Sequence, residues 1–341
     1  MASFAKYAAD NGLDFDAWWG ADSKAELVHF IGKDILYFHA LFWPAMLKFA
    51  GTPYKVPDSV YVHGFITVSG EKMSKSRGTG IDPLRYLEVG MSPEWFRYYV
   101  AAKLNSRVED IDFNPDDFLQ RVNSDLIGKY INIASRCAGF ISKRFGGIVA
   151  KHDQLSESKG AHLMGEFFAS DSLIAEAYEN RDFGKAIREI MRLADRANEY
   201  VNEQAPWALA KQEGQDAKLH EVCTVSLNLF HVLTLYLKPI LPKLAAQVES
   251  FLNIKPLAWS DIGLILDGRI NDYSHLMTRL DPKLVEAMVN ANKESLKPVT
   301  ETHSEQRHAA HQQHTANVEA AEASKNFEPF ISIDDFMKVD L

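Results

Sequence analysis

The chain has 341 residues, of which 46% are hydrophobic, and its 37 basic and 46 acidic side chains give a formal net charge of −9. This length and apolar content allow a sizeable buried core and predict at least two domains. The net negative charge argues against non-specific binding to polyanions, although a locally basic face can still contact a structured RNA. No apolar window of about 18 residues predicts a membrane span, and the first residues lack the apolar core of a signal peptide. We therefore expect a cytoplasmic protein.

The sequence offers few metal-binding patterns. Cys137 and Cys223, the only cysteines, lie in apolar helical contexts, which predict buried free thiols and exclude a cysteine-based zinc site. His308, His311 and His314 are spaced three residues apart, as metal ligands can be. They lie in a polar segment without nearby cysteine or packed carboxylates, so a solvated linker is the favoured interpretation.

The first hundred residues mix helix and strand signals. Residues 26–50 show a long helical pattern interrupted at Pro44, and residues 61–68 form a β-branched and aromatic run that predicts a strand. Asp82-Pro83 and Ser92-Pro93 each place a capping side chain before a proline, which predicts that helices begin there. This order of elements indicates an α/β region.

A basic loop, Lys72–Ser76, follows the predicted strand. Its five residues stand between glycines and before the helix at Asp82-Pro83, which is the local architecture of a polyphosphate site. Lysines placed there would stabilise negative charge that builds on phosphate oxygens in a transition state. A solvated lysine loop is the alternative. The loop consists of Lys72, Met73, Ser74, Lys75 and Ser76.

In the middle of the chain, several segments show helical apolar periodicity. This pattern predicts an all-helical bundle of about five helices. The residues after it are polar and predict a linker, and the last fifteen residues look like the start of a further domain. The helical segments are 116–145, 162–180, 183–204, 216–238 and 240–253, and the expected divisions of the chain are 1–115, 116–288, 289–326 and 327–341.

Residues 30–43 form a nearly all-apolar run with polar insertions at Lys33, Asp34 and His39. On a helix, Ile35 and His39 would share one face. Spacing alone favours a buried helix with a hydrogen-bonded core histidine. The functional alternative is one wall of an amino-acid pocket, where an apolar surface with one polarisable imidazole would suit a thioether side chain.

Residues 116–145 place apolar side chains on one side and a mostly cationic stripe on the other. A solvated face is the ordinary interpretation, but such a stripe with an amide and small residues also suits contact with RNA. Trp207, which follows Gln204-Ala205-Pro206 at a predicted helix end, is either a stacking platform for an unpaired base or a core residue. The stripe comprises Arg121, Lys129, Asn132, Arg136 and Lys143, with Gly128, Gly139 and the single acid Asp125.

The loop Lys72–Ser76 matches the signature loop of class I aminoacyl-tRNA synthetases. Together with residues 30–43, the strand 61–68, Asn132-Ile-Ala-Ser-Arg136 and Gln204-Ala-Pro-Trp207, it resembles the methionyl-tRNA synthetases of bacterial type over residues 26–260. The resemblance implies a partial Rossmann-like class I catalytic domain, a helical anticodon-binding bundle, and from Phe327 the opening of an OB-fold tRNA-binding domain.

The resemblance also implies roles for individual residues. Lys75 would be the principal contact to the ATP phosphates, with Lys72 as a helper within the loop Lys72, Met73, Ser74, Lys75 and Ser76. Asp34 and Gly32 would approach the adenosine of ATP, and Ile35 and His39 would line the methionine pocket. The CAU anticodon would be read by Asn132, Arg136, Pro206 and Trp207.

The implied activity is that of a methionine–tRNA ligase, with ATP and Mg²⁺ as the substrate complex and with methionine and tRNA(Met) as partners. A homodimer would form through the C-terminal domain. The family's His-Ile-Gly-His signature, its zinc knuckle and its amine-binding aspartate have no match here, so we expect a fragment at both ends that is inactive alone. The alternatives are another class I synthetase of the aliphatic group and a non-catalytic tRNA-binding protein.

Overall fold

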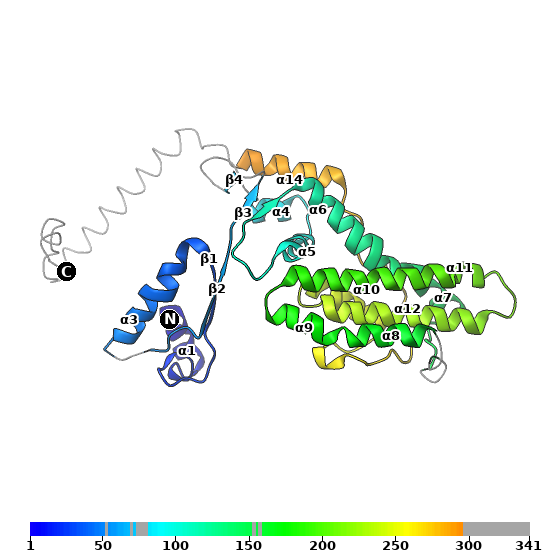
Figure 1. Ribbon diagram of the computed structural model, residues 1–341, viewed down its shortest axis with the longest axis horizontal. Coiled ribbons are helices and arrows are strands. Elements are labelled where there is room, and N and C mark those ends of the chain that lie inside the picture. The colour runs from blue at the N-terminus through cyan, green and yellow to red at the C-terminus, as the bar shows by residue number, and fades with distance from the viewer. Residues whose placement is uncertain (52–53, 69–70, 73–80, 152–154, 156–158, 296–341) are drawn as a thin grey trace, which may run out of the picture.

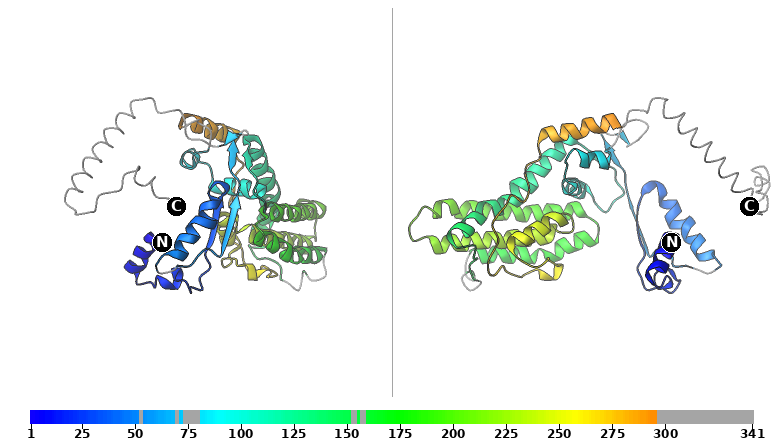
Figure 2. Two further views of the ribbon diagram at one scale, coloured as in Figure 1. Left: turned by 60° about the vertical axis from the view of Figure 1, so that its left-hand side comes forward. Right: turned by 180° about the vertical axis from the view of Figure 1, so that it is seen from behind.

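The computed structural model describes residues 1–51, 54–68, 71–72, 81–151, 155 and 159–295. Two small sheets occupy the N-terminal part, and a helical bundle follows (Figure 1). Figure 2 shows from two further sides that the first residues, in blue, and the bundle, in green, lie at opposite ends. Among the described helices, none is long and apolar enough to cross a membrane.

The first sheet contains two parallel strands. Its register places Val28 opposite Ser59 and Gly32 opposite His63. A 3₁₀ turn and a π-helical turn leave the end of the first strand and lead into a helix. The elements are α1 (Ala2–Asn11), α2 (Asp16–Trp19), β1 (Val28–Gly32), η1 (Lys33–Ile35), η2 (Phe38–Phe42), α3 (Trp43–Phe49) and β2 (Ser59–His63).

The expectation of one helical pattern over residues 26–50 is wrong in its first part, because Val28–Gly32 form β1. A short apolar run does not by itself distinguish a buried helix from a strand, and its β-branched and aromatic residues favour the strand. Pro44 does not interrupt the helix either. The backbone is already helical in η2, so Pro44 lies within a continuous helix, just after the wider π turn.

The single strand expected over residues 61–68 is also wrong, because β2 ends at His63 and β3 (Ile66–Val68) belongs to a second sheet. The chain crosses between the sheets at Gly64, where an added Cβ would lie only 2.1 Å from the Glu109 carbonyl oxygen. Glycine is therefore required by close backbone approach. The second sheet has the order β4-β3-β5, in which β4 (Glu71–Lys72) is antiparallel and β5 (Ile111–Phe113) parallel to β3.

The two helix starts predicted in the N-terminal part are confirmed. The Asp82 carboxylate accepts hydrogen bonds from the Leu84 and Arg85 N–H groups at the start of α4 (Pro83–Glu88). Ser92 caps α5 (Pro93–Lys103) in the same way. These caps satisfy backbone donors that a helix start leaves unpaired.

The bundle confirms the predicted helical character, with differences in detail. The helix expected over 183–204 has those bounds, whereas the segment 162–180 contains two helices that meet at Ser170. A last helix, Pro282–Ser295, crosses the expected boundary between the bundle (116–288) and the linker (289–326). The elements are α6 (Pro115–Arg121), η4 (Val122–Ile131), α7 (Asn132–Arg144), α8 (Lys159–Ala169), α9 (Asp171–Glu179), α10 (Phe183–Gln204), α11 (Pro206–Leu209), α12 (Asp216–Leu237), α13 (Pro242–Leu252), η6 (Trp259–Asp261) and α14 (Pro282–Ser295).

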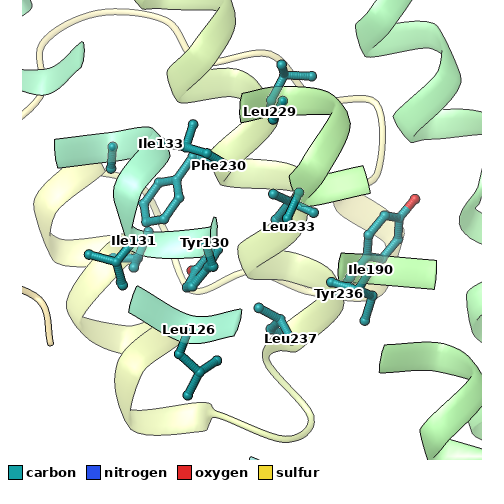
Figure 3. Packing of buried hydrophobic residues seen from close by; sticks show 14 of the residues in the cluster. Leu126, Tyr130, Ile131, Ile133, Ile190, Leu229, Phe230, Leu233, Tyr236 and Leu237 are labelled. Carbon is teal, nitrogen blue, oxygen red and sulfur yellow. The ribbon is translucent and has the colours of Figure 1, made fainter. Parts of the chain in front are cut away.

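Helix α12 is the centre of the bundle, since all its residues from Val222 to Leu237 are buried. In the core shown in Figure 3, Tyr130 of η4 stacks on Phe230 with ring centres 4.7 Å apart. The Tyr130 hydroxyl lies 2.6 Å from the Thr234 hydroxyl, so its polar atom is satisfied. This packing holds the η4–α7 helix against α12 and thereby fixes the surface that η4 and α7 present to solvent.

Helix α5 joins the sheets to the bundle through buried polar contacts. The Glu94 carboxylate, in a side chain only 5% exposed, accepts hydrogen bonds from the Lys243 N–H (2.6 Å) and the Leu244 N–H (2.9 Å) at the start of α13. The Arg97 guanidinium donates to the Ile240 carbonyl at 2.8 Å. A carboxylate at a helix N-terminus and a guanidinium on nearby carbonyls together fix the position of α5 on α13.

Candidate functional site

The predicted phosphate-binding loop lies mostly outside the described residues. The backbone of Lys72 ends strand β4, whereas Met73, Ser74, Lys75 and Ser76 are outside the part of the chain that the structure describes. Strand β4, which already includes Lys72, stands before the remaining loop residues in place of the single strand expected over 61–68, and the predicted capped helix α4 follows them. The lysine loop therefore keeps its predicted place in the chain, and the roles of its residues remain predictions.

Four predicted ligand residues gather at the carboxyl end of β1. Gly32 ends the strand, Asp34 and Ile35 form the 3₁₀ turn η1, and His39 lies in η2. An added Cβ on Gly32 would lie 2.8 Å from the Asp34 carboxylate, so the glycine allows this carboxylate to fold back over the strand end. The carboxyl ends of parallel strands are where α/β proteins bind ligands.

His39 has a partner that the sequence did not indicate. Its Nδ1 lies 3.0 Å from the Nδ1 of His29, and the His29 ring in turn stacks on Trp43 with ring centres 5.2 Å apart. Burial lowers the pKa of His29, and the positive charge of a protonated His39 lowers it further. The two half-buried imidazoles therefore contact each other, and protonation of both at once is unfavourable. The contact also holds the His39 ring in place.

The predicted anticodon residues belong to α7 and α11, which lie at the far end of the bundle (Figure 1), and among them Arg136 and Trp207 are in contact. The Arg136 guanidinium carbon lies 4.6 Å from the centre of the Trp207 ring, within cation–π range. Trp207 is 39% exposed and Arg136 is half-buried, so both reach solvent. Ala205, at φ 43°, turns the chain between α10 and α11 and puts Pro206 in the first turn of α11.

Asn132 is held by a side chain that sequence reasoning missed. Its Nδ2 donates to the Asn198 Oδ1 at 3.0 Å, and the Asn198 amide donates to the carbonyls of Lys129 and Ala194. Because this network crosses from α7 to α10, separated by 66 residues in the chain, no local sequence pattern indicates it. The network fixes the orientation of the Asn132 amide.

The cationic stripe on the η4–α7 face is less uniform than predicted. Lys129 forms a 2.8 Å ion pair with Asp195, and Arg121 lies 3.6 Å from Asp117. Asp125, expected on the stripe, instead accepts a hydrogen bond from the Tyr98 hydroxyl. The expected stripe with Asp125 as its single acid is therefore only partly basic in the structure, because acids from α6 and α10 neutralise Arg121 and Lys129.

Comparison with known proteins agrees with this arrangement. Residues 1–138 match the family model "tRNA synthetases class I (M)", and residues 154–268 match "Anticodon binding domain of methionyl tRNA ligase". The methionine–tRNA ligase of Thiobacillus denitrificans is 62% identical over 343 residues, which cover all of this chain and 48% of that protein. The chain belongs to the methionyl-tRNA synthetase family.

Two further methionyl-tRNA synthetases also match this chain. The methionine–tRNA ligase of Methylibium petroleiphilum is 56% identical to this chain. The match covers all of this chain and 46% of that protein. Among solved structures, this chain resembles the crystal structure of Mycobacterium tuberculosis methionyl-tRNA synthetase bound by methionyl-adenylate, with a TM-score of 0.64. The two sequences are 25% identical, and the match covers 74% of this chain and 50% of that one. The chain thus spans about half the length of the curated relatives it matches.

The zinc that the family implies has no candidate ligands in the described part of this synthetase chain. No cluster of three or more His, Cys, Asp or Glu side chains that could hold a metal ion occurs among the described residues. Cys137 and Cys223 are free and buried, as predicted, on α7 and α12. The part of the chain that the structure describes therefore holds no group of ligands for a structural zinc ion, which requires four.

Proposed function

We propose that this chain supplies the phosphate-binding loop and the anticodon-binding bundle of a methionine–tRNA ligase. The reaction forms methionyl-adenylate and pyrophosphate from methionine and ATP, and then transfers the methionyl group to tRNA(Met). The observation that carries the proposal is the Arg136–Trp207 pair, a guanidinium over an accessible indole at the end of a helical bundle. Unpaired bases are recognised by stacking on such aromatic and guanidinium planes.

At the other end, the residues around β1 would bind the small substrates. Ile35 and the ring of His39, held by His29, would line the methionine side chain, and Asp34 and Gly32 would approach the adenosine. Lys75, helped by Lys72, would neutralise charge on the pyrophosphate of the ATP–Mg²⁺ complex. Met73, Ser74 and Ser76 would shape the loop that carries these lysines.

At the anticodon end, Asn132 and Arg136 present an amide and a guanidinium along one side of α7, and Pro206 sets the position of Trp207 at the start of α11. These groups can together stack on and hydrogen-bond to the CAU bases. We further propose that the protein acts in the cytoplasm and that residues 327–341 open an OB-fold used for tRNA binding and dimerisation. That segment lies outside the described residues.

A chimera tests the catalytic assignment. The chain replaces the corresponding half of the Thiobacillus denitrificans relative, to which it is 62% identical, and methionine-dependent pyrophosphate exchange and tRNA(Met) charging are measured. We expect activity close to that of the parent enzyme. Lys75→Ala should lower the exchange rate about 100-fold or more, as loss of one transition-state donor does, whereas Lys185→Ala, at an exposed position on α10, should not.

The same chimera discriminates the rivals. Another class I synthetase of the aliphatic group would drive exchange with leucine or valine rather than with methionine. A non-catalytic tRNA-binding protein would leave the chimera inactive with every amino acid, or, if the rest of the parent enzyme sustains activity, its lysine loop would tolerate Lys75→Ala. Either result would refute the ligase assignment for this chain.

A further inference from the structure

Helix α11, which carries Trp207, is too short to hold its own position. It has four residues, Pro206–Leu209, and follows Ala205 at φ 43°, so the chain leaves the direction of α10 abruptly. Helices this short are marginal unless other parts of the fold hold them. Pro206 is buried and fixes the start of α11. The position of the indole therefore also depends on what holds the other end.

Arg144, the last residue of α7, holds that other end. Its Nη2 donates to the carbonyl oxygen of Ala210, the residue after α11, at 2.6 Å, and its Nη1 donates to the Asp216 carboxylate at 2.8 Å. Asp216 is the first residue of α12. A guanidinium can donate in two directions at once, and its charge strengthens both hydrogen bonds. One side chain thereby joins the ends of α7 and α11 to the start of α12, at the far end of the bundle (Figure 1).

The end of α7 that carries Arg144 is itself fixed to α12. The ring of the next residue, Phe145, stacks on His220 of α12 with ring centres 4.1 Å apart. The His220 Nε2 also lies 2.8 Å from the Ile148 carbonyl oxygen. The base of the Arg144 side chain therefore has a defined position, and its reach to Ala210 sets where α11 ends.

Two arginines of α7 thus act on α11 at different points. Arg136 lies 4.6 Å from the centre of the Trp207 ring, whereas Arg144 binds the backbone three residues further on, at Ala210. Because Arg136 is proposed to bind the anticodon, its contact with the indole can change when RNA arrives. The contacts of Arg144 are to protein groups 66 and 72 residues away in the chain, so they do not depend on RNA and no local sequence pattern indicates them.

We infer that Arg144 is a positioning residue for anticodon recognition, which keeps α11 against α7 and α12 so that Trp207 is in place before a base stacks on it. The inference rests on the proposed function, because that function assigns Trp207 to the anticodon. Pre-organisation of this kind increases affinity by lowering the cost of ordering the site. Since both Nη atoms of Arg144 already bind protein groups, the inference assigns it no contact with phosphate.

The test measures binding of fluorescent RNA hairpins to the full chain, with the CAU anticodon or with one base changed, over a series of salt concentrations. Arg144→Gln should weaken CAU binding about fivefold, as loss of a hydrogen bond from a charged group does, and should reduce the preference for CAU. The slope of log K against log salt should stay the same, because no phosphate contact is lost. Arg188→Gln, which removes an exposed charge near the start of α10, should change neither.

Two further variants separate positioning from direct contact with RNA. In a Trp207→Ala background, Arg144→Gln should cost no further affinity for the CAU hairpin, because both changes act through the same indole. Asp216→Asn should not tighten CAU binding relative to Glu213→Gln, which removes the same charge from an exposed residue between α11 and α12. An arginine that contacted phosphate would instead bind RNA more tightly once Asp216 is neutral.

The outcomes also separate this inference from the proposed function. If the wild-type chain prefers CAU and Trp207→Ala loses the preference while Arg144→Gln keeps it, the positioning role is overturned and the proposed function stands. An equal loss for all hairpins, with a salt slope smaller by about 1, would place Arg144 on the phosphate backbone and also overturn the role. Urea denaturation of Arg144→Gln should give a midpoint close to that of the wild-type chain, and a much lower midpoint would show a general structural role instead. A wild-type chain without a CAU preference would contradict the proposed function itself.

Discussion

The Arg136–Trp207 pair has the features of a binding surface rather than of core packing. A core tryptophan would be covered, yet Trp207 is 39% exposed and its outer partner is a guanidinium, with Pro206 buried behind it. A stacked guanidinium is pre-organised for planar recognition, so little side-chain freedom remains to be lost when a base arrives. The pair is therefore suited to base stacking before any RNA is bound.

His231 is a buried titratable residue of a different kind, since it contributes to stability rather than to binding. Burial within α12 lowers its pKa to about 4, and the carboxylates of Asp261 and Glu249, which act in the opposite direction, do not compensate. The unfolded chain binds a proton at this histidine below its ordinary pKa of about 6.5, whereas the folded chain does so only near pH 4. Stability from this residue is thus complete above pH 6.5 and is lost as the pH falls toward 4.

We predict that His231→Gln flattens the acid dependence of stability. In the wild-type chain this histidine should remove about 3 kcal/mol from the free energy of unfolding between pH 7 and pH 4, at about 1.4 kcal/mol per pH unit. Urea denaturation of both proteins at the two pH values measures the difference. An equal loss in wild type and variant would show that His231 is not buried in its neutral form.

At the scale of elements, α5 connects the sheets to the bundle through two side-chain contacts. Its Glu94 carboxylate caps the start of α13 and its Arg97 holds the carbonyl of Ile240, so two side chains one turn apart hold the segment that joins α12 to α13. Buried charged groups of this kind are costly to leave half-paired. The relative placement of the substrate end and the anticodon end therefore depends on this contact.

Glu94→Ala should lower the free energy of unfolding by about 2–3 kcal/mol, because two buried N–H groups lose a charged acceptor. Glu94→Gln, which keeps one acceptor oxygen, should cost less. Equilibrium denaturation measures both, and Glu88→Gln, which breaks the exposed pair with Arg85, serves as the control with a change below about 1 kcal/mol. A Glu94→Ala variant as stable as this control would contradict the role of α5.

Elements whose signals are local could be predicted from the sequence. The caps Asp82 and Ser92 and the span of α10 follow from neighbouring residues and periodicity alone. Strand β1 could not be predicted, because an apolar run fits a helix as well as a strand, and the break at Gly64 depends on the distant Glu109 carbonyl. The supporting residue Asn198 acts across the fold, so no motif reveals it.

At the scale of the whole molecule, the structure separates two kinds of chemistry. The β1 end carries the residues proposed for methionine and ATP, and the α7–α11 end carries those proposed for the anticodon, with α6 and η4 between them in the chain (Figure 1). This separation is what a tRNA requires if its two ends are to be recognised by one protein. The bundle end can be tested in the chain as it stands, because its core is continuous within the described residues.

The most direct measurement is the affinity of the chain for RNA hairpins that differ only in the three anticodon bases. We predict that a CAU hairpin binds at least tenfold more tightly than hairpins with one base changed. Trp207→Ala should weaken CAU binding by about 1–3 kcal/mol and remove most of this preference, whereas Phe49→Ala, at an exposed aromatic on α3, should leave it intact. Equal affinity for all hairpins, or an unchanged preference in Trp207→Ala, would contradict the account.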